Sequence, residues 1–203
     1  RMLVSTLLIS STFLFQADEM AKDFKKFFRK EKDPSMRVEL IYSLEGEESI
    51  SIAEVLLPVL EDKQADAARA ARIVLSGFKD HLNRLPFLEV IEDGKKEARI
   101  AQLLHAASDM RWRDFAEAGV LNLESDSEEC RLWAVNLCGN LKNYLAIDVI
   151  ALILANDENG IIRAAAVQAL EDMGLDHEDV AAPPLIAALD DPLSAVNVAA
   201  CVA

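Results

Sequence analysis

The chain of 203 residues contains few of the residues that form turns, with seven glycines and six prolines. A many-stranded β fold needs frequent turns of this kind, so the sequence disfavours one. Aromatic residues are also few, at 6%, whereas the hydrophobic fraction reaches 52%. Long stretches of Ala, Leu and Glu favour helix. We therefore predict an all-α protein with an aliphatic core.

Positive charge is scarce as well, because 21 Lys and Arg face 35 Asp and Glu, for a net charge of −14. Phosphate backbones attract cations and repel carboxylates, so we expect no nucleic-acid partner. One basic cluster, KDFKKFFRKEK at residues 22–32, runs against this trend. Our interpretation is the solvated face of an amphipathic helix whose phenylalanines point inward.

Cysteine is limited to Cys130, Cys138 and Cys201, which is too few for a disulfide framework. The first two lie eight residues apart in one predicted helix, a rise of about 12 Å. A disulfide requires Cα atoms within roughly 7 Å, so we expect these two to be small core residues.

The first seventeen residues, RMLVSTLLISSTFLFQA, differ from the rest of the chain. A basic start, an uncharged apolar run and a small residue at Ala17 are typical of a secretory signal peptide. We predict a signal peptide at 1–17, with a buried first helix as the alternative. The protein is then periplasmic or extracellular, and otherwise cytoplasmic. A membrane association is expected only if this segment is an uncleaved anchor.

An internal repeat begins with an aspartate and continues with an Ala-rich helix. The anchor aspartates are Asp33, Asp62, Asp93, Asp126, Asp157 and Asp191, at intervals of 29, 31, 33, 31 and 34 residues. Apolar residues then recur on one helical face, as in Ile162, Ala166–Val167 and Ala169–Leu170. We predict each anchor to be an N-cap of the helix that follows.

A second set of amphipathic helices ends just before each anchor, and prolines recur in or near these helices at Pro58, Pro86 and Pro183–Pro184. Each repeat is therefore predicted to be a helix, a tight turn and a second helix. A helix pair of this kind buries its apolar face only by stacking on its neighbours.

The pattern of Asp157, Ile162, Arg163, Ala166, Ala169 and Leu170 resembles the HEAT-repeat family, in particular its short PBS-lyase-type form. The resemblance implies a right-handed α-solenoid of about six helix-turn-helix repeats over residues 18–203. The stretch VNVAACVA is not a polar cap. We therefore expect a solenoid truncated at its C-terminus, or one whose end is covered by a partner.

In such repeats the aspartate and arginine commonly form a ladder between neighbouring repeats. The resemblance assigns that role to the pairs Asp93/Arg99, Asp126/Arg131 and Asp157/Arg163. Asn197 stands where the arginine is expected, so the ladder should weaken there.

The resemblance also implies that the second helices line a concave binding face, which suits a protein or peptide ligand. Most outward positions there are small, including Ala70, Ala101 and Ala164, and Trp133 is the exception. We predict a partner-binding group comprising Trp133, Asn136, Asn140, Leu132 and Gln168. The alternative is that Trp133 packs between neighbouring repeats. Acidic turns suggest that the partner is basic.

An enzymatic role is the second hypothesis, because some relatives with this repeat handle bilin chromophores and others are di-iron hydroxylases. The recognition part of a larger enzyme is a further version of it. Only His177–Glu178 forms a His-Glu pair, and one pair cannot supply a two-metal site. The sequence has no Gly-rich phosphate loop and no Gly-x-Ser-x-Gly motif. We therefore expect a binding scaffold without catalytic residues, metal or cofactor.

Overall fold

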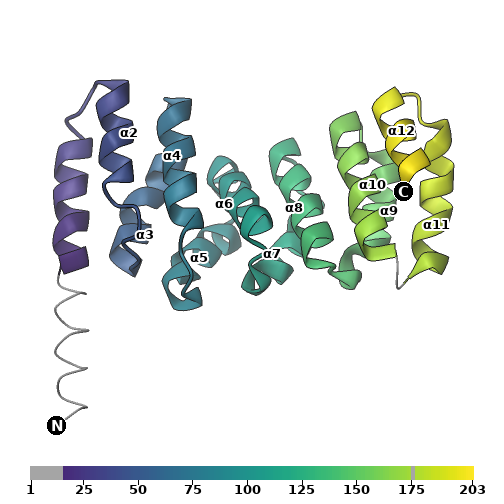
Figure 1. The fold of residues 1–203 in the computed structure, drawn as a ribbon, viewed down its shortest axis with the longest axis horizontal. Coiled ribbons are helices and arrows are strands. Elements are labelled where there is room, and N and C mark those ends of the chain that lie inside the picture. Colours follow the sequence, from purple (N-terminus) through teal and green to yellow (C-terminus); the bar gives the residue numbers. More distant parts are fainter. Residues whose placement is uncertain (1–15, 175–176) are drawn as a thin grey trace, which may run out of the picture. The chain divides into compact units, whose positions relative to one another are not determined.

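The computed structural model describes residues 16–174 and 177–203, and all regular structure in these ranges is helical (Figure 1). This confirms the predicted all-α class. The predicted signal peptide, residues 1–17, lies outside the described residues except for its last two. Gln16 and Ala17 belong to a helix whose described part covers residues 16–28.

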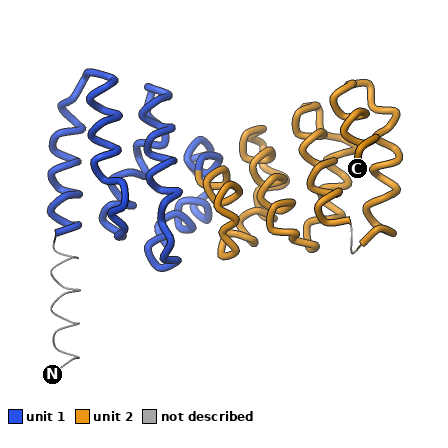
Figure 2. The backbone as a smooth tube through the Cα atoms, in the orientation of Figure 1, with its two compact units in different colours: residues 1–102 blue, residues 103–203 orange. Residues whose placement is uncertain are grey.

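The chain divides into two compact units, residues 1–102 and 103–203 (Figure 2). In the first unit the described helices after residue 28 are α2 (Pro34–Tyr42), α3 (Ile50–Leu56), η1 (Leu57–Glu61), α4 (Ala65–Ser76), η2 (His81–Arg84) and α5 (Leu85–Asp93). Helix α6 (Glu97–Met110) contains the boundary between the units. Within the first unit, α4 packs on α2 and η1, and α3 packs on α5.

The second unit continues with η3 (Arg113–Phe115), α7 (Ala116–Leu121), α8 (Glu128–Leu141), η4 (Tyr144–Ala146), α9 (Ile147–Asn156), α10 (Gly160–Gly174), α11 (Glu178–Ala187), η5 (Ala188–Asp190) and α12 (Ser194–Val202). Helix α10 packs against α8, α9, α11 and α12, so it forms the centre of this unit.

The predicted division of each repeat into two helices is confirmed. First helices are composite, because a 3-10 turn precedes α5, α7 and α9 and follows α3 and α11. The prolines fit this arrangement: Pro58 and Pro86 are the second residues of η1 and α5, whereas Pro183–Pro184 lie inside α11. Second helices α2, α4, α6, α8, α10 and α12 follow the anchor aspartates.

The buried residues follow the helical period read from the sequence. In α10 these are Ile162, Ala166, Val167, Ala169, Leu170 and Met173. None of the three cysteines, all of which are described, forms a disulfide, with Cys130 and Cys138 buried in α8 and Cys201 exposed. Burial raises the pKa of the Cys138 thiol to about 12, so this thiol stays neutral and acts as a small apolar residue. Two positions were predicted wrongly as outward-facing, because Ala70 and Ala101 are buried.

Helices α8 and α10 approach each other closely at a glycine. A Cβ added to Gly139 would lie 2.8 Å from the Cβ and 2.9 Å from the Cα of Ala169. Such distances are shorter than atomic contacts allow, so any larger residue at position 139 would force the two helices apart. Glycine is therefore required here by packing, because its backbone is ordinary right-handed helix.

We predict that Gly139→Ala lowers the free energy of unfolding by about 1–3 kcal/mol, because the backbone of Ala169 cannot move aside easily. Chemical denaturation would measure the change. Gly119→Ala is the matched control, since its added Cβ would meet the movable side-chain ends of Cys138 and Leu137 at 3.1 and 3.2 Å. Helix propensity alone would make both substitutions stabilising, so a stabilised Gly139→Ala would contradict the packing argument.

Candidate protein-binding surface

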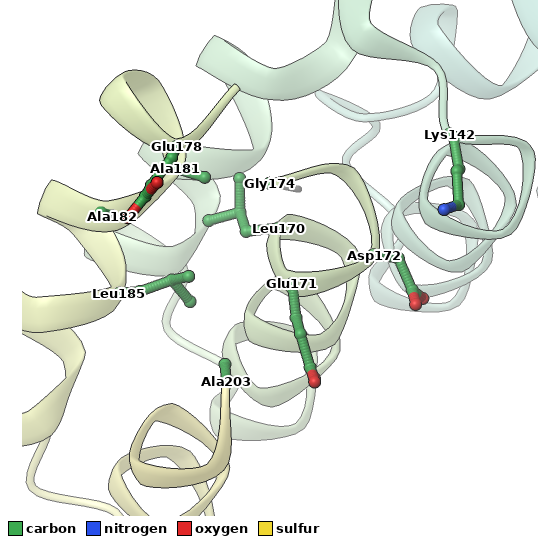
Figure 3. Close-up of a pocket in the computed structure, with 10 residues that line it drawn as sticks. All are labelled: Lys142, Leu170, Glu171, Asp172, Gly174, Glu178, Ala181, Ala182, Leu185 and Ala203. Carbon is green, nitrogen blue, oxygen red and sulfur yellow. The ribbon is translucent and has the colours of Figure 1, made fainter. Parts of the chain in front are cut away.

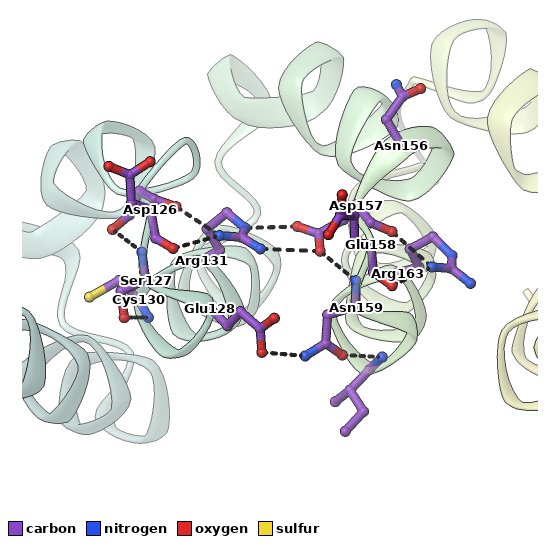
Figure 4. Close-up of polar contacts among 12 residues, drawn as sticks. Asp126, Ser127, Glu128, Cys130, Arg131, Asn156, Asp157, Glu158, Asn159 and Arg163 are labelled. Carbon is purple, nitrogen blue, oxygen red and sulfur yellow. Dashed lines mark hydrogen bonds and ion pairs between the residues drawn. The ribbon is translucent and has the colours of Figure 1, made fainter.

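Helices α8 and α10 each carry an arginine that forms a bidentate ion pair with the anchor aspartate of the next repeat. The Nε of Arg131 lies 2.8 Å from Oδ2 of Asp157, and its Nη2 lies 3.3 Å from Oδ1 (Figure 4). Arg163 makes the same pair with Asp191 at 2.8 and 3.0 Å. The arginine therefore reaches the anchor aspartate of the next repeat.

Each of these arginines also closes its own turn. The Nη1 of Arg131 donates to the carbonyl of Ser125 at 2.9 Å, and the Nη1 of Arg163 donates to that of Asp157 at 2.8 Å. In both cases the carbonyl lies six residues before the arginine. Asn197 makes only the contact with its own turn, in which its Nδ2 donates to the carbonyl of Asp191 at 3.3 Å. The shorter asparagine thus preserves the turn, but it has no charge for a further pair.

In the described part of the first unit, an arginine and the anchor aspartate of the next repeat also pair, but through a single guanidinium nitrogen. Arg37 pairs with Asp62, and its Nη1 donates to the carbonyl of Glu31 at 3.1 Å, again six residues back. The sequence assignment missed this pair because Arg37 lies only four residues after its anchor, Asp33. The signal that could have found it is the six-residue distance to Glu31 rather than the distance to an aspartate.

All three assigned pairs differ from the assignment, and the hydrogen bond from Arg163 to Asp157 goes to the backbone carbonyl. Arg99 bonds backwards to Glu61, with Nη2 to Oε2 at 2.8 Å, and Asp93 pairs with the nearby Lys95. Asp126 contributes its backbone carbonyl to Arg131, at 3.2 Å. The arginine therefore contacts its own turn through carbonyls and the next repeat through the carboxylate.

The anchor aspartates are also not N-caps in general. Asp33 caps α2 by accepting from Met36 N, at 3.0 Å. Asp157 and Asp191 instead accept from the N–H two residues later, at 2.9 and 2.8 Å, and each precedes its helix by three residues. This position holds the carboxylate outside the helix end, where the arginine of the preceding repeat can reach it.

The ion pairs change the acidity of both aspartates. Burial works to raise the pKa of Asp157, but hydrogen bonds from Arg131 and from the Asn159 N–H, with the charges of Arg131 and Arg163, hold it below its ordinary value. The hydrogen bond from Arg163 is the main cause of the lowered pKa of Asp191, and it outweighs the opposing effect of burial. The side chain of Asp157 is only 4% exposed, so this pair is shielded from solvent.

The predicted binding residues lie on α8 and α10. The Trp133 ring stacks on His105 of α6, with ring centroids 3.4 Å apart and planes 10° apart. Asn140 donates from Nδ2 to Ser108 Oγ at 2.9 Å, and Asn136 donates to the carbonyl of Leu132 at 2.9 Å. These four predicted residues are half-buried, so Trp133 does pack against a neighbouring repeat while part of its ring stays accessible.

The repeat brings equivalent residues of α8 and α10 to the same side. Asn136 and Gln168 each follow their ladder arginine by five residues, and Asn140 and Asp172 follow by nine. We call the group Trp133, Asn136, Asn140, Gln168, Glu171 and Asp172 the α8–α10 face. Gln168 is exposed and donates to Glu171 at 2.9 Å. This face is aromatic at one end, amide-rich in the middle and acidic at the other end.

A groove of about 500 Å³ adjoins the acidic end of this face, between α10 and α11 (Figure 3). Leu170, Ala181 and Leu185 form its apolar part, while the carboxylates of Glu171 and Glu178 stand at its edge. Lys142 and Asp172 line it from the α8 side. A groove with apolar walls and mainly acidic edges can hold the aliphatic stem and cationic head of a lysine or arginine.

In the part of the chain that the structure describes, no group of three or more His, Cys, Asp and Glu side chains is arranged to hold a metal ion. No helix within residues 16–174 and 177–203 is long and apolar enough to cross a bilayer.

Comparison with protein families gives a match in the second half of the chain. Residues 118–203, which cover most of the second unit, match the family model for HEAT repeats. No curated protein matched the chain. The matched stretch contains both bidentate pairs of the second unit, so the Arg131–Asp157 and Arg163–Asp191 contacts lie in the part of the chain that is similar to HEAT repeats.

We predict that Arg131→Gln lowers the free energy of unfolding by about 2–3 kcal/mol, because it leaves the shielded carboxylate of Asp157 without its cation. Chemical denaturation would measure the loss. Arg113→Gln makes the same chemical change at an exposed arginine of η3 and should cost less than about 0.5 kcal/mol. Equal losses in the two variants would show that the ion pair does not stabilise the stack.

The lowered pKa of Asp157 and Asp191 predicts a loss of stability in acid. A carboxylate that is more acidic when folded stabilises the protein above its unfolded pKa, and this contribution disappears as pH falls through the folded pKa. Unfolding free energy should therefore drop below about pH 4.

The free energy of unfolding of Asp157→Asn should differ most from that of wild type at neutral pH, and the two values should converge in acid. Denaturant titrations at a series of pH values would measure them. Asp148→Asn, at an exposed position of α9, serves as the control and should run parallel to wild type. A constant difference between Asp157→Asn and wild type at all pH values would refute the assignment.

Proposed function

We propose that this HEAT-repeat chain is a non-catalytic scaffold that binds a segment of a partner protein along the α8–α10 face. HEAT repeats generally mediate protein–protein interactions, which supports the class of function. The observation that carries the specific site is the Trp133–His105 stack, which presents a half-buried aromatic ring in a polar surround. Tryptophans in such surroundings are favoured as energetic centres of protein interfaces.

The chemistry of the face favours a partner segment with at least one basic residue. Glu171, Asp172 and Glu178 place three carboxylates around the groove against the single cation of Lys142. A lysine or arginine of the partner would lay its stem on Ala182 and Leu185 and direct its charge to these carboxylates. The apolar or aromatic part of the same segment would contact Trp133 at the other end. Export through residues 1–17 stays part of this proposal.

We predict that Trp133→Ala weakens binding of the partner at least about tenfold, the loss typical of an interface centre. His105→Ala is the matched control, because it removes the same ring stack and leaves the indole in place. The partner would first be captured with a photoreactive residue at Gln168 and then titrated against each variant. Capture from Leu152, which is exposed on α9, should fail.

Three results would contradict the proposal. Equal losses in Trp133→Ala and His105→Ala would show that Trp133 acts only through packing. Equal capture from positions 168 and 152 would place the partner elsewhere. Co-purification of a coloured or metal-bound species, with no protein captured, would favour an enzymatic role. A basic partner also requires binding to weaken as salt concentration rises.

A further inference from the structure

The first described helix carries a cluster of five cations. Lys22, Lys25, Lys26, Arg29 and Lys30 are all exposed and together line one shallow hollow. Their spacing of i, i+3, i+4, i+7 and i+8 places them on one side of a helix. The last two follow residue 28, but the N–H groups of Arg29 and Lys30 still bond to the carbonyls of Lys25 and Phe27. We call these five residues the basic face.

Packing on the opposite side fixes the direction of the basic face. Ala17, Ala21 and Phe24 are buried, and the Phe24 and Phe28 rings stack with centroids 4.9 Å apart. Arg37 of α2 lies over the Phe28 ring, with its guanidinium carbon 3.9 Å from the centroid. The helix is thus held by its apolar side, and Figure 1 shows it in purple at the edge of the first unit, next to α2.

The charge of this segment is opposite to that of the rest of the chain. Six cationic and two acidic side chains give residues 22–32 a formal charge of +4, which leaves −18 for the remainder. Cations near a helix C-terminus stabilise the helix dipole, but this effect is limited to the last turn. The helix dipole therefore does not explain the cations that begin at Lys22. We take the basic face to be a binding surface for an external anion.

An exposed phenylalanine next to this face indicates which anion. The Phe27 side chain is 52% exposed, and the Lys26 ammonium lies 5.6 Å from its ring centroid. A large apolar ring left in water beside clustered lysines is typical of helices that lie on bilayers, where the ring enters the acyl boundary and the cations meet lipid phosphates. An acidic protein segment would use the cations but would give Phe27 no comparable apolar environment.

We propose that the basic face, with Phe27 at its border, docks the protein on an anionic lipid surface. Electrostatic attraction supplies the dependence on lipid charge, and Phe27 supplies contact with the acyl region. This inference concerns the first unit and is independent of the partner segment proposed for the α8–α10 face.

Vesicle co-sedimentation of the full chain would test the proposal. The vesicles are phosphatidylcholine alone and phosphatidylcholine mixed with phosphatidylserine. The wild type should bind the anionic vesicles far more tightly than the neutral ones, and added salt should weaken this binding. Lys25→Glu with Lys26→Glu should weaken it at least about tenfold.

The matched control is Lys63→Glu with Lys79→Glu, which makes the same change in net charge at exposed lysines of the first unit. Its binding should stay within about twofold of wild type, since the proposal depends on the location of the charge. Phe27→Ser should weaken binding to anionic vesicles and leave the helical circular dichroism unchanged.

Three outcomes would overturn the inference. Equal binding to neutral and anionic vesicles would assign membrane contact to another segment. Equal losses of vesicle binding in the two double variants would show that binding depends only on the net charge of the protein. Binding to polyglutamate that depends on Lys25 and Lys26, without binding to vesicles, would make an acidic protein segment the partner instead.

Discussion

The bidentate contact between an arginine and the aspartate one repeat later is the interaction on which the second unit depends. Arg131 and Arg163 each use one part of the guanidinium to close their own turn and another part to hold the next repeat. A lysine could not do both, because it lacks the planar fork of donors. Local turn formation and repeat stacking are thus coupled through a single side chain, which is already oriented by its own turn before it meets the aspartate.

This coupling also determines which side chains lie together on the α8–α10 face. Because the ladder arginines fix how α8 lies beside α10, residues at equal distances from them come to the same side. Gly139 allows the two helices to approach closely at Ala169, so their exposed side chains form one surface. The ends of that surface differ chemically because α8 contributes Trp133 and two asparagines, whereas α10 contributes Gln168, Glu171 and Asp172. A nearly regular stack of helices therefore carries an asymmetric face.

The sequence was sufficient for the class of fold, the division into helix pairs and most buried positions, since each depends on local periodicity. It was insufficient wherever residues far apart in the chain meet. The stacking of Trp133 on His105 and the bond from Asn140 to Ser108 depend on how neighbouring repeats are placed. The same limit explains why Arg99 was assigned to the wrong acidic partner and why Arg37 was missed. The N-cap prediction failed for Asp157 and Asp191 because their carboxylates bind the preceding repeat.

The double role of the arginine also restricts where a repeat can change in length. The distance from the turn carbonyl to the side chain that binds it is six residues at Arg37, Arg131, Arg163 and Asn197. The distance from the arginine to the next aspartate varies, at 25, 26 and 28 residues. The variable span includes the rest of the second helix, since α2 ends five residues after Arg37 and α8 ends ten residues after Arg131. Insertions and deletions are therefore expected after the arginine and excluded from the short segment before it. The unequal repeat lengths of this chain therefore reflect one segment of constant length followed by one of variable length.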